Sequence, residues 1–352
     1  MSINQTKLDD LVLRAVGDLS GGYAGVMMSL GHKLGLYSAM YGAGPLTPAE
    51  VARRAGCHER YVREWLHAQV AGLYVDYDAV SGKFELTPEQ ALVLADASSP
   101  TFMPLAWQVP ASMWFDEEKS LAAFRSGDGV AWGEHDERLF CGSAAFYRNT
   151  YRGNLVQHWL PALDGVTERL ERGAVVADVG CGQGHSSILL AQAFPHTRVH
   201  GYDVHAGSLA EASVLAEEAG VEDRVHFAEA RASDYAGQNF DLICFFDCLH
   251  DMGHPLAAVS HAKAALAPGG TVMVIEPFAN DSLENNINPV ARIYYAASTT
   301  LCCAHAISER GTHVLGAQAG EQRIAQIFHE AGFQYFRRAA ETPFNLVFEA
   351  RA

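Results

Sequence analysis

Short runs rich in Val and Ile alternate with stretches of helical periodicity in the part of the chain that begins at Ala174. We expect strands over Val175–Val179, Arg198–Tyr202, Arg224–Ala228, Phe240–Phe246 and Thr271–Ile275. Runs that are apolar throughout are typical of parallel strands covered by helices on both faces of a sheet. The alternation therefore predicts an α/β fold built on an open, mostly parallel sheet.

Two further runs, Gln334–Ala339 and Asn345–Ala350, are joined by only a few residues. A parallel connection needs about a dozen residues or more, so this pair must form an antiparallel hairpin at the sheet edge. The prediction for 174–352 is a seven-stranded Rossmann-like sheet that ends in a C-terminal antiparallel hairpin. Residues 279–316 interrupt the alternation, and we interpret them as a lid insertion with an apolar helix over Pro289–Cys303.

The chain before this sheet divides into two zones. Residues 1–99 hold short helical patterns, with a capped helix over Leu46–Gly56 and a second helix over Arg60–Val70. A hairpin is expected next, from the strands Leu73–Val75 and Lys83–Leu86. Together these elements resemble a winged helix-turn-helix, which predicts a mainly helical winged-helix domain. Residues 100–173 are rich in aromatic residues and Met, and we interpret them as a helical linker and substrate-lid region.

Charge and composition exclude several classes of protein. The formal net charge of −16 argues against broad attraction to nucleic acid or anionic lipid. No apolar run reaches the roughly 18 residues of a membrane span, and seven scattered cysteines suit reduced thiols. Cys302, Cys303 and His305 lack the paired C-x2-C spacing of zinc ligands. We expect a cytoplasmic protein that does not interact with membranes and has no metal site.

A glycine-rich turn follows the first expected strand, in the order Asp178, Gly180, Gly182, Gly184. Glycines let a backbone turn tightly and approach a ligand closely. Asp203 closes the next strand, where a carboxylate can accept both ribose hydroxyls. The glycine spacing departs from the G-x-G-x-x-G of dinucleotide sites, which weakens a pyrophosphate interpretation.

This motif resembles that of the class I S-adenosylmethionine-dependent methyltransferases, and the resemblance runs from Ala174 to the end. It implies S-adenosylmethionine as cofactor, with Asp178 near its amino group and the three glycines beneath its methionine part. The cofactor-binding residues that it implies are Asp178, Gly180, Gly182, Gly184, Asp203, Val204, Ala232, Ser233, Phe246 and Asp247. One departure is Arg231, which stands where the family often has an acidic residue that contacts adenine, and Asp234 is the alternative.

His250 follows the fourth strand, at the edge where open α/β sheets bind ligands. Its ordinary pKa lets it take a proton from a hydroxyl as the oxygen attacks a methyl group. The segment resembles that of the small-molecule O-methyltransferases typified by plant caffeic acid O-methyltransferases, in which a Glu orients the His, and Glu276 occupies that place. The alternatives are a packing or capping role for His250 and a solvated strand end for Glu276.

The same resemblance gives the remaining expectations. The substrate-pocket residues are Phe146, Tyr147, Tyr151, Tyr294 and Tyr295, and plain core packing is the alternative for each. The winged-helix domain is expected to serve a homodimer rather than to read DNA through Arg60 and Arg63, because glutamates nearly balance its arginines. We predict methyl transfer to a hydroxyl of a small aromatic or natural-product-like molecule. A ligand-sensing transcriptional regulator, or an N-, S- or C-methyltransferase without a protein base, are the alternatives.

Overall fold

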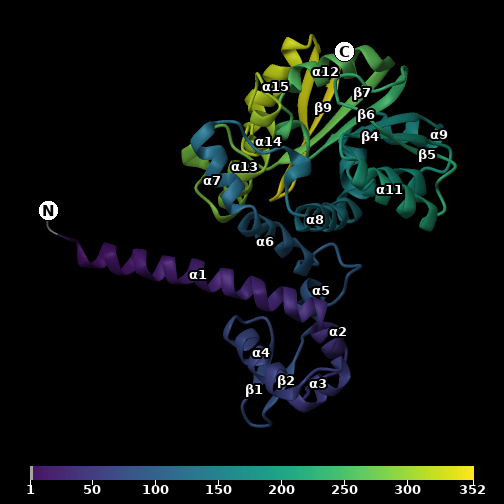
Figure 1. Cartoon of the computed structure of the whole chain (residues 1–352). Coiled ribbons are helices and arrows are strands. Elements are labelled where there is room, and N and C mark those ends of the chain that lie inside the picture. The colour runs from purple at the N-terminus through teal and green to yellow at the C-terminus, as the bar shows by residue number, and fades with distance from the viewer. Residues whose placement is uncertain (1–2) are drawn as a thin grey trace. The chain divides into compact units, whose positions relative to one another are not determined.

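The computed structural model describes residues 3–352, which form two compact units (Figure 1). The first unit contains residues up to Val109 together with Cys141–Asn149. The second contains Pro110–Phe140 and Thr150–Ala352. The aromatic-rich segment 100–173 thus contributes to both units, and the domain boundaries expected from the sequence stay predictions.

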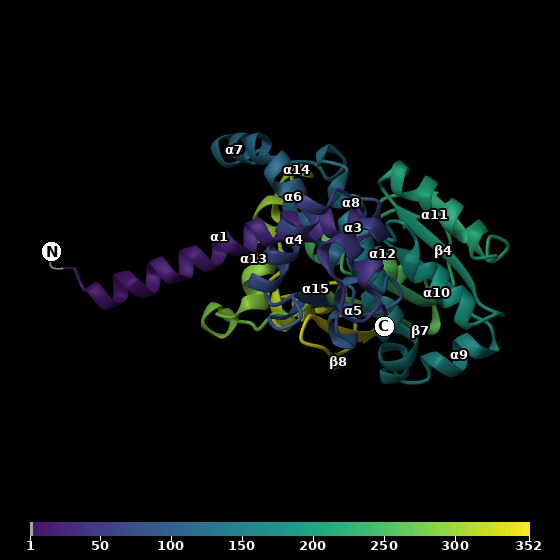
Figure 2. The same cartoon turned by 90° about the horizontal axis from the view of Figure 1, so that it is seen from below.

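The first unit is mainly helical, as predicted. Its helices are α1 (Gln5–Lys33), α2 (Leu36–Met40), α3 (Pro48–Ala55), α4 (Glu59–Ala71) and α5 (Pro88–Leu94), followed by the 3-10 helix η1 (Pro104–Trp107). Helix α3 begins with the expected capping box, in which Thr47 and Glu50 bond each other's backbone N–H, and it ends at the left-handed Gly56. In both views α1 extends well beyond the other elements of its own unit (Figures 1 and 2).

The hairpin of this unit differs in part from its prediction. Its strands are β1 (Asp76–Asp78) and β2 (Lys83–Glu85), so the first strand begins after the expected Leu73–Val75. Leu73 has a φ of 61°, and the Tyr74 N–H donates to Gln69 O. These residues therefore terminate α4 instead of entering the sheet.

The sheet of the second unit confirms the predicted fold class. Its strands are β3 (Val175–Val179), β4 (Arg198–Asp203), β5 (Val225–Glu229), β6 (Phe240–Phe246), β7 (Leu266–Pro277), β8 (Tyr335–Glu341) and β9 (Asn345–Arg351). They lie in the order β5-β4-β3-β6-β7-β9-β8. The first five are parallel, and β9 pairs antiparallel with both β7 and β8. The C-terminal hairpin is at the sheet edge, where it was expected.

The remaining helices of the described chain differ in length. They are α6 (Gln108–Phe115), α7 (Glu117–Ser126), α8 (Arg138–Asn154), α9 (Val166–Arg172), α10 (His185–Ala193), α11 (Ala206–Glu218), α12 (Pro255–Ala265), α13 (Pro289–Thr300), α14 (Cys302–Ser308) and α15 (Gly320–Glu330). Short turns are η2 (Trp132–Glu134), η3 (Leu155–Trp159), η4 (Leu160–Ala162), η5 (Leu249–Asp251) and η6 (Leu283–Asn286). The single apolar helix expected over Pro289–Cys303 is instead two helices that meet at Leu301.

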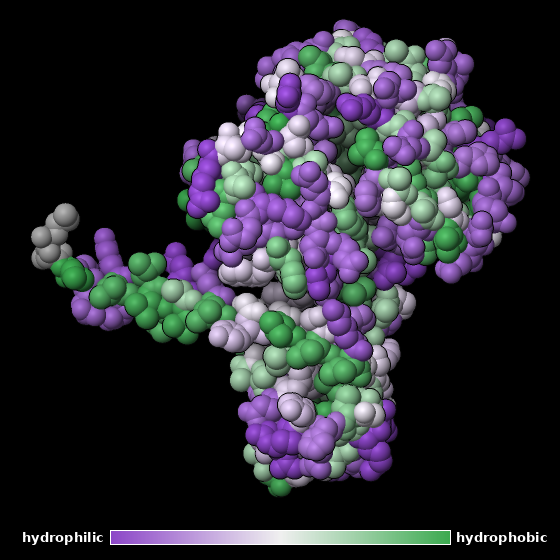
Figure 3. All heavy atoms as spheres, in the orientation of Figure 1, coloured by the Kyte–Doolittle hydropathy of each residue, from purple (hydrophilic) through white to green (hydrophobic). Residues whose placement is uncertain are grey.

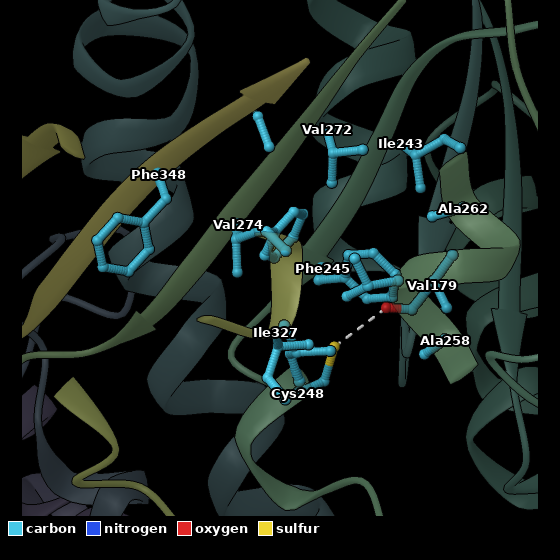
Figure 4. Packing of buried hydrophobic residues seen from close by; sticks show 14 of the residues in the cluster. Val179, Ile243, Phe245, Cys248, Ala258, Ala262, Val272, Val274, Ile327 and Phe348 are labelled. Atoms are coloured by element: carbon cyan, nitrogen blue, oxygen red, sulfur yellow. Dashed lines mark hydrogen bonds between the residues drawn. The ribbon is translucent and has the colours of Figure 1, made fainter. Parts of the chain in front are cut away.

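The core of the second unit lies between the central strands and the helices α12 and α15. Figure 4 shows Ile243 and Phe245 of β6, Val272 and Val274 of β7, and Ala258 of α12 packed together. These side chains are at most 1% exposed. Because a shift of one residue would turn them out of the core, their burial fixes the register of the strands. Such a core fixes the positions of the loops at the carboxyl ends of β3, β4 and β6.

Candidate active site

The glycine-rich turn after β3 has the backbone that its glycines predict. Gly180, Gly182 and Gly184 have φ values of 76°, 53° and 70°. The N–H groups of Gly180 and Cys181 both donate to Tyr202 O, which ties the turn to β4. A Cβ on Gly184 would lie 2.4 Å from the Phe227 ring, whereas one on Gly182 would meet nothing within 4 Å. Gly182 is therefore where a ligand can approach the backbone closely.

Asp203 joins the end of β4 to this turn. Its Oδ2 accepts the N–H of Gly182 at 2.8 Å, and its Oδ1 accepts the N–H of His205 at 2.8 Å. The carboxylate is half-buried, so lone pairs remain for a further donor. The structure thus brings together two predicted residues from separate strands.

Asp178 has a different environment, beneath the turn. Its side chain has no exposed surface, and Oδ2 accepts the hydroxyls of Ser186 and Ser187, each at 2.6 Å. Burial raises the pKa of Asp178, which the two serine hydrogen bonds partly offset. Among residues 3–352, no donor lies within hydrogen-bond distance of its Oδ1. Asp178 therefore binds the first turn of α10 through Oδ2 and has a buried acceptor, Oδ1, for a ligand.

A cavity of about 590 Å³ lies beside the carboxyl ends of β4 and β5. Its lining residues are Tyr202, Val204, Ala228, Glu229, Ala230, Arg231, Asp234, Ala236 and Glu309. Val204 was predicted, whereas Ala232 and Ser233 belong to the same loop but do not line the cavity. Glu309 comes from the end of α14, and no local motif in the sequence indicated it. Its position depends on how the insertion folds back over the strand ends.

The loop after β6 brings His250 against Glu276 at the end of β7. His250 Nδ1 lies 2.6 Å from Glu276 Oε2, and Glu276 Oε1 accepts the N–H of Leu249 at 3.1 Å. Both side chains are almost fully buried, each 3% exposed. A carboxylate on Nδ1 fixes the ring orientation and leaves the other ring nitrogen for proton transfer.

Burial and charge act in opposite directions on this histidine. Burial lowers the pKa of His250, but the Glu276 carboxylate and Cys302 outweigh it and raise the pKa well above 6.5. Burial raises the pKa of the neighbouring Asp251 to about 7. Glu276 can therefore stabilise the imidazolium that forms when His250 takes a proton.

Asp247 directly follows β6, and its N–H donates to Ile275 O of β7. Its backbone is in the left-handed region, which is uncommon for residues other than glycine. Its φ is 52°, and its carboxyl accepts the hydroxyl of Tyr151 at 3.2 Å and the Asn345 Nδ2 at 2.9 Å. Burial, followed by the Glu276 charge, raises the pKa of Asp247 well above its ordinary value. The Phe246 and Tyr151 rings are 5.7 Å apart, so Tyr151 covers both predicted residues at this strand end.

The aromatic residues predicted to line a pocket do not all belong to one unit. Phe146 and Tyr147 belong to the first unit, where their rings are 5.4 Å apart. Tyr151, Tyr294 and Tyr295 belong to the second. Tyr294 is buried and donates its hydroxyl to Phe344 O, whereas Tyr295 is 37% exposed. Tyr151 and Tyr294 are thus fixed near Asp247.

Fold and strand-end geometry together define the class I methyltransferase fold, with its glycine-rich turn, strand-end carboxylate and C-terminal hairpin. Residues 22–96 match the Rv2258c-like winged HTH domain, and residues 170–332 match a methyltransferase domain. The chain therefore combines a winged helix-turn-helix domain with a methyltransferase domain, as the sequence predicted.

Curated relatives align with only part of the chain. A ubiquinone biosynthesis O-methyltransferase of Dinoroseobacter shibae is 32% identical over 104 residues, 29% of this chain and 40% of that protein. A trans-aconitate 2-methyltransferase of Streptomyces avermitilis is 33% identical over 110 residues, 31% of this chain and 41% of that protein. The chain spans less than half the length of these relatives.

Solved structures resemble the whole chain in fold. The human N-acetylserotonin methyltransferase, solved with S-adenosylmethionine, has a TM-score of 0.70 at 17% identity and covers 97% of both chains. The mitomycin 7-O-methyltransferase has a TM-score of 0.68 at 18% identity, over 99% of this chain and 100% of its own. At such identities the likeness establishes the fold.

Proposed function

We propose that this protein is an S-adenosylmethionine-dependent methyltransferase that acts on a hydroxyl of a small molecule, with His250 as general base. The observation that carries the proposal is the buried His250–Glu276 pair at the same sheet edge as Gly182 and Asp203. A methyl transfer needs an aligned, deprotonated nucleophile, and a base supported by a carboxylate supplies the second requirement.

The residues at the strand ends fit the proposed cofactor. Gly182 leaves open space above the turn, Asp203 has lone pairs for ribose hydroxyls, and the unused Oδ1 of Asp178 is a buried acceptor below the turn. Val204 and Tyr202 offer apolar and aromatic surface to the adenine ring in the adjacent cavity. When bound, S-adenosylmethionine supplies an electrophilic methyl group on a sulfonium.

His250 then has a defined task. Its Nδ1 stays with Glu276, and its Nε2 accepts the proton of the acceptor hydroxyl while the oxygen attacks the methyl group. Glu276 stabilises the imidazolium that results, as its effect on the His250 pKa indicates. Burial of the pair excludes water, which strengthens this electrostatic support.

An aromatic hydroxyl is the acceptor that we favour. Tyr151 and Tyr294 lie near the strand-end loop that carries Asp247 and His250, and aromatic side chains stack on planar molecules. Relatives in sequence and fold are named for ubiquinone biosynthesis and for N-acetylserotonin and mitomycin methylation. Methyl transfer to nitrogen, sulfur or carbon without a base is the competing proposal.

Cofactor binding has a direct test. S-adenosylhomocysteine at 100 times its dissociation constant should stabilise the fold by about 2.7 kcal/mol, measured as a thermal shift. Asp203→Ala should weaken binding at least about tenfold, because a ribose acceptor is lost. Asp223→Ala, an exposed aspartate after α11, is the matched control and should bind like wild type. Absence of any shift in wild type would contradict the cofactor assignment.

The geometry of α4 does not favour the alternative of a DNA-binding regulator. Arg60 pairs with Glu64 and Arg63 pairs with Glu59, so the two arginines that were candidates for base contacts are neutralised on their own helix. Fluorescence anisotropy with labelled duplex DNA at low salt should therefore show no binding by the full chain. Saturable binding that weakens steeply with salt would support the regulator instead.

We further propose a homodimer in which α1 packs against a second copy. Val12, Val16, Leu19, Tyr23, Val26 and Leu30 recur at alternating intervals of four and three residues along α1, and each is 43–69% exposed. Figure 3 shows apolar side chains along this helix.

Every helix within residues 3–352 is too short or too polar to span a bilayer. The free thiols of seven cysteines suit a reducing compartment, so a cytoplasmic location stays our prediction.

A further inference from the structure

The cavity beside β4 and β5 offers three carboxylates to a ligand. They come from Glu229, Asp234 and Glu309, and Arg231 is the single cation of its lining. If this cavity holds the adenine of the proposed cofactor, the exocyclic amino group needs a hydrogen-bond acceptor. The three carboxylates differ in how well each is fixed to provide one.

Two of them, Asp234 and Glu229, belong to exposed residues. Asp234 accepts the backbone N–H of Arg231 at 3.2 Å through its Oδ1, so its carboxylate closes its own short turn. Glu229 is the last residue of β5 and is also exposed. An exposed carboxylate already binds water, and a ligand's amino group only replaces that water. Its net contribution to the free energy of ligand binding is therefore small.

Glu309 is held in a more defined position. It follows α14, is partly buried, and its Oε2 accepts the N–H of Gly253 at 2.8 Å. A Cβ on Gly253 would lie 2.7 Å from the Cβ of Glu309, so the two backbones are in close contact. One carboxylate oxygen, Oε2, is thereby anchored, which leaves Oε1 for a further donor.

We infer that Glu309 is the residue that recognises the adenine amino group, through Oε1. This inference rests on the proposed function and assigns the recognition to the insertion rather than to the loop after β5.

The assignment connects the cofactor to the catalytic pair. Helix α14 begins at Cys302, whose side chain lies close enough to His250 to help raise the pKa of that histidine, and it ends beside Glu309. Residues 129–132 hold the same helix, because the Val130 N–H donates to Ala304 O and the Trp132 N–H donates to His305 Nδ1. A ligand contact at Glu309 therefore acts on the same helix whose Cys302 adjoins His250.

Calorimetric titration of the full chain with S-adenosylhomocysteine and its deaminated analogue S-inosylhomocysteine tests this inference. The analogue replaces the amino donor by a carbonyl acceptor. Wild type should prefer the adenosyl compound by about tenfold or more, the value of one well-placed hydrogen bond. Glu309→Gln presents a donor in place of the acceptor while its amide oxygen can still bind Gly253, so the preference should vanish or invert. Glu217→Gln, on the exposed side of α11, is the matched control and should keep it.

Each result decides between assignments. An unchanged preference in Glu309→Gln, or a preference lost in Asp234→Asn instead, would overturn the inference. If Glu309→Gln does not fold, Glu309→Asp, which withdraws the carboxylate by one methylene, should lower the preference as well. Wild type that binds neither compound would contradict the proposed function itself, which separates that failure from failure of the Glu309 assignment.

Discussion

At the scale of single residues, His250 and Glu276 set how the rate should depend on pH. The base must be neutral to accept a proton, and Glu276 raises its pKa well above 6.5 despite burial. Methyl transfer should therefore be slow below that pKa and rise as the pH rises through it. In Glu276→Gln the acid limb should move to lower pH and the maximal rate should fall at least about tenfold, measured as kcat against pH. An acid limb that stays in place would show that Glu276 does not act on the base.

Asp247 gives a second prediction at this scale. Because burial raises its pKa, the folded state keeps a proton that the unfolded chain releases, and its contribution to stability is lost as pH rises towards the folded pKa. Asp247→Asn mimics the protonated form and tolerates a positive φ. The variant should therefore be about as stable as wild type at low pH and more stable at high pH, in thermal melts across pH. A constant difference between the two proteins would contradict a protonated Asp247.

At the scale of elements, the glycine-rich turn separates packing from ligand binding. Gly184→Ala should destabilise the fold by about 2–4 kcal/mol, because its Cβ would lie 2.4 Å from Phe227 at a φ of 70°. Gly182→Ala adds a Cβ in open space and should cost only about 1 kcal/mol of conformational strain. It should nevertheless weaken S-adenosylhomocysteine binding, which calorimetry can check. Equal stability of the two variants, or unimpaired binding by Gly182→Ala, would contradict this account of the turn.

The sequence predicted those parts of the fold and site that depend on local pattern. Apolar runs located the strands to within a few residues, and strand ends located Asp203, His250 and Glu276, since parallel strands bring their carboxyl ends to one edge. Elements that depend on tertiary packing were less predictable. The wing strand begins later than expected because Leu73 terminates α4, and Glu309 reaches the cavity only through the folding of the insertion.

At the scale of the whole molecule, the proposed dimer depends on the apolar face of α1. Val16→Glu with Leu19→Glu places charges on that face and should convert the protein to a monomer in light scattering after size exclusion. Ser20→Glu adds a charge outside the apolar repeat and should leave the dimer intact. A double variant that keeps the mass of a dimer would show that another surface joins the copies, and a monomeric wild type would contradict the dimer.

The central claim is that this chain transfers a methyl group to a hydroxyl with His250 as base. Its most direct test is release of S-adenosylhomocysteine from S-adenosylmethionine over a panel of phenols, catechols, carboxylic acids, amines and thiols, for wild type and His250→Ala. We predict turnover of a hydroxylated acceptor that falls by about 10²- to 10⁴-fold in the variant. Turnover confined to amines or thiols, or equal in the two proteins, would contradict it.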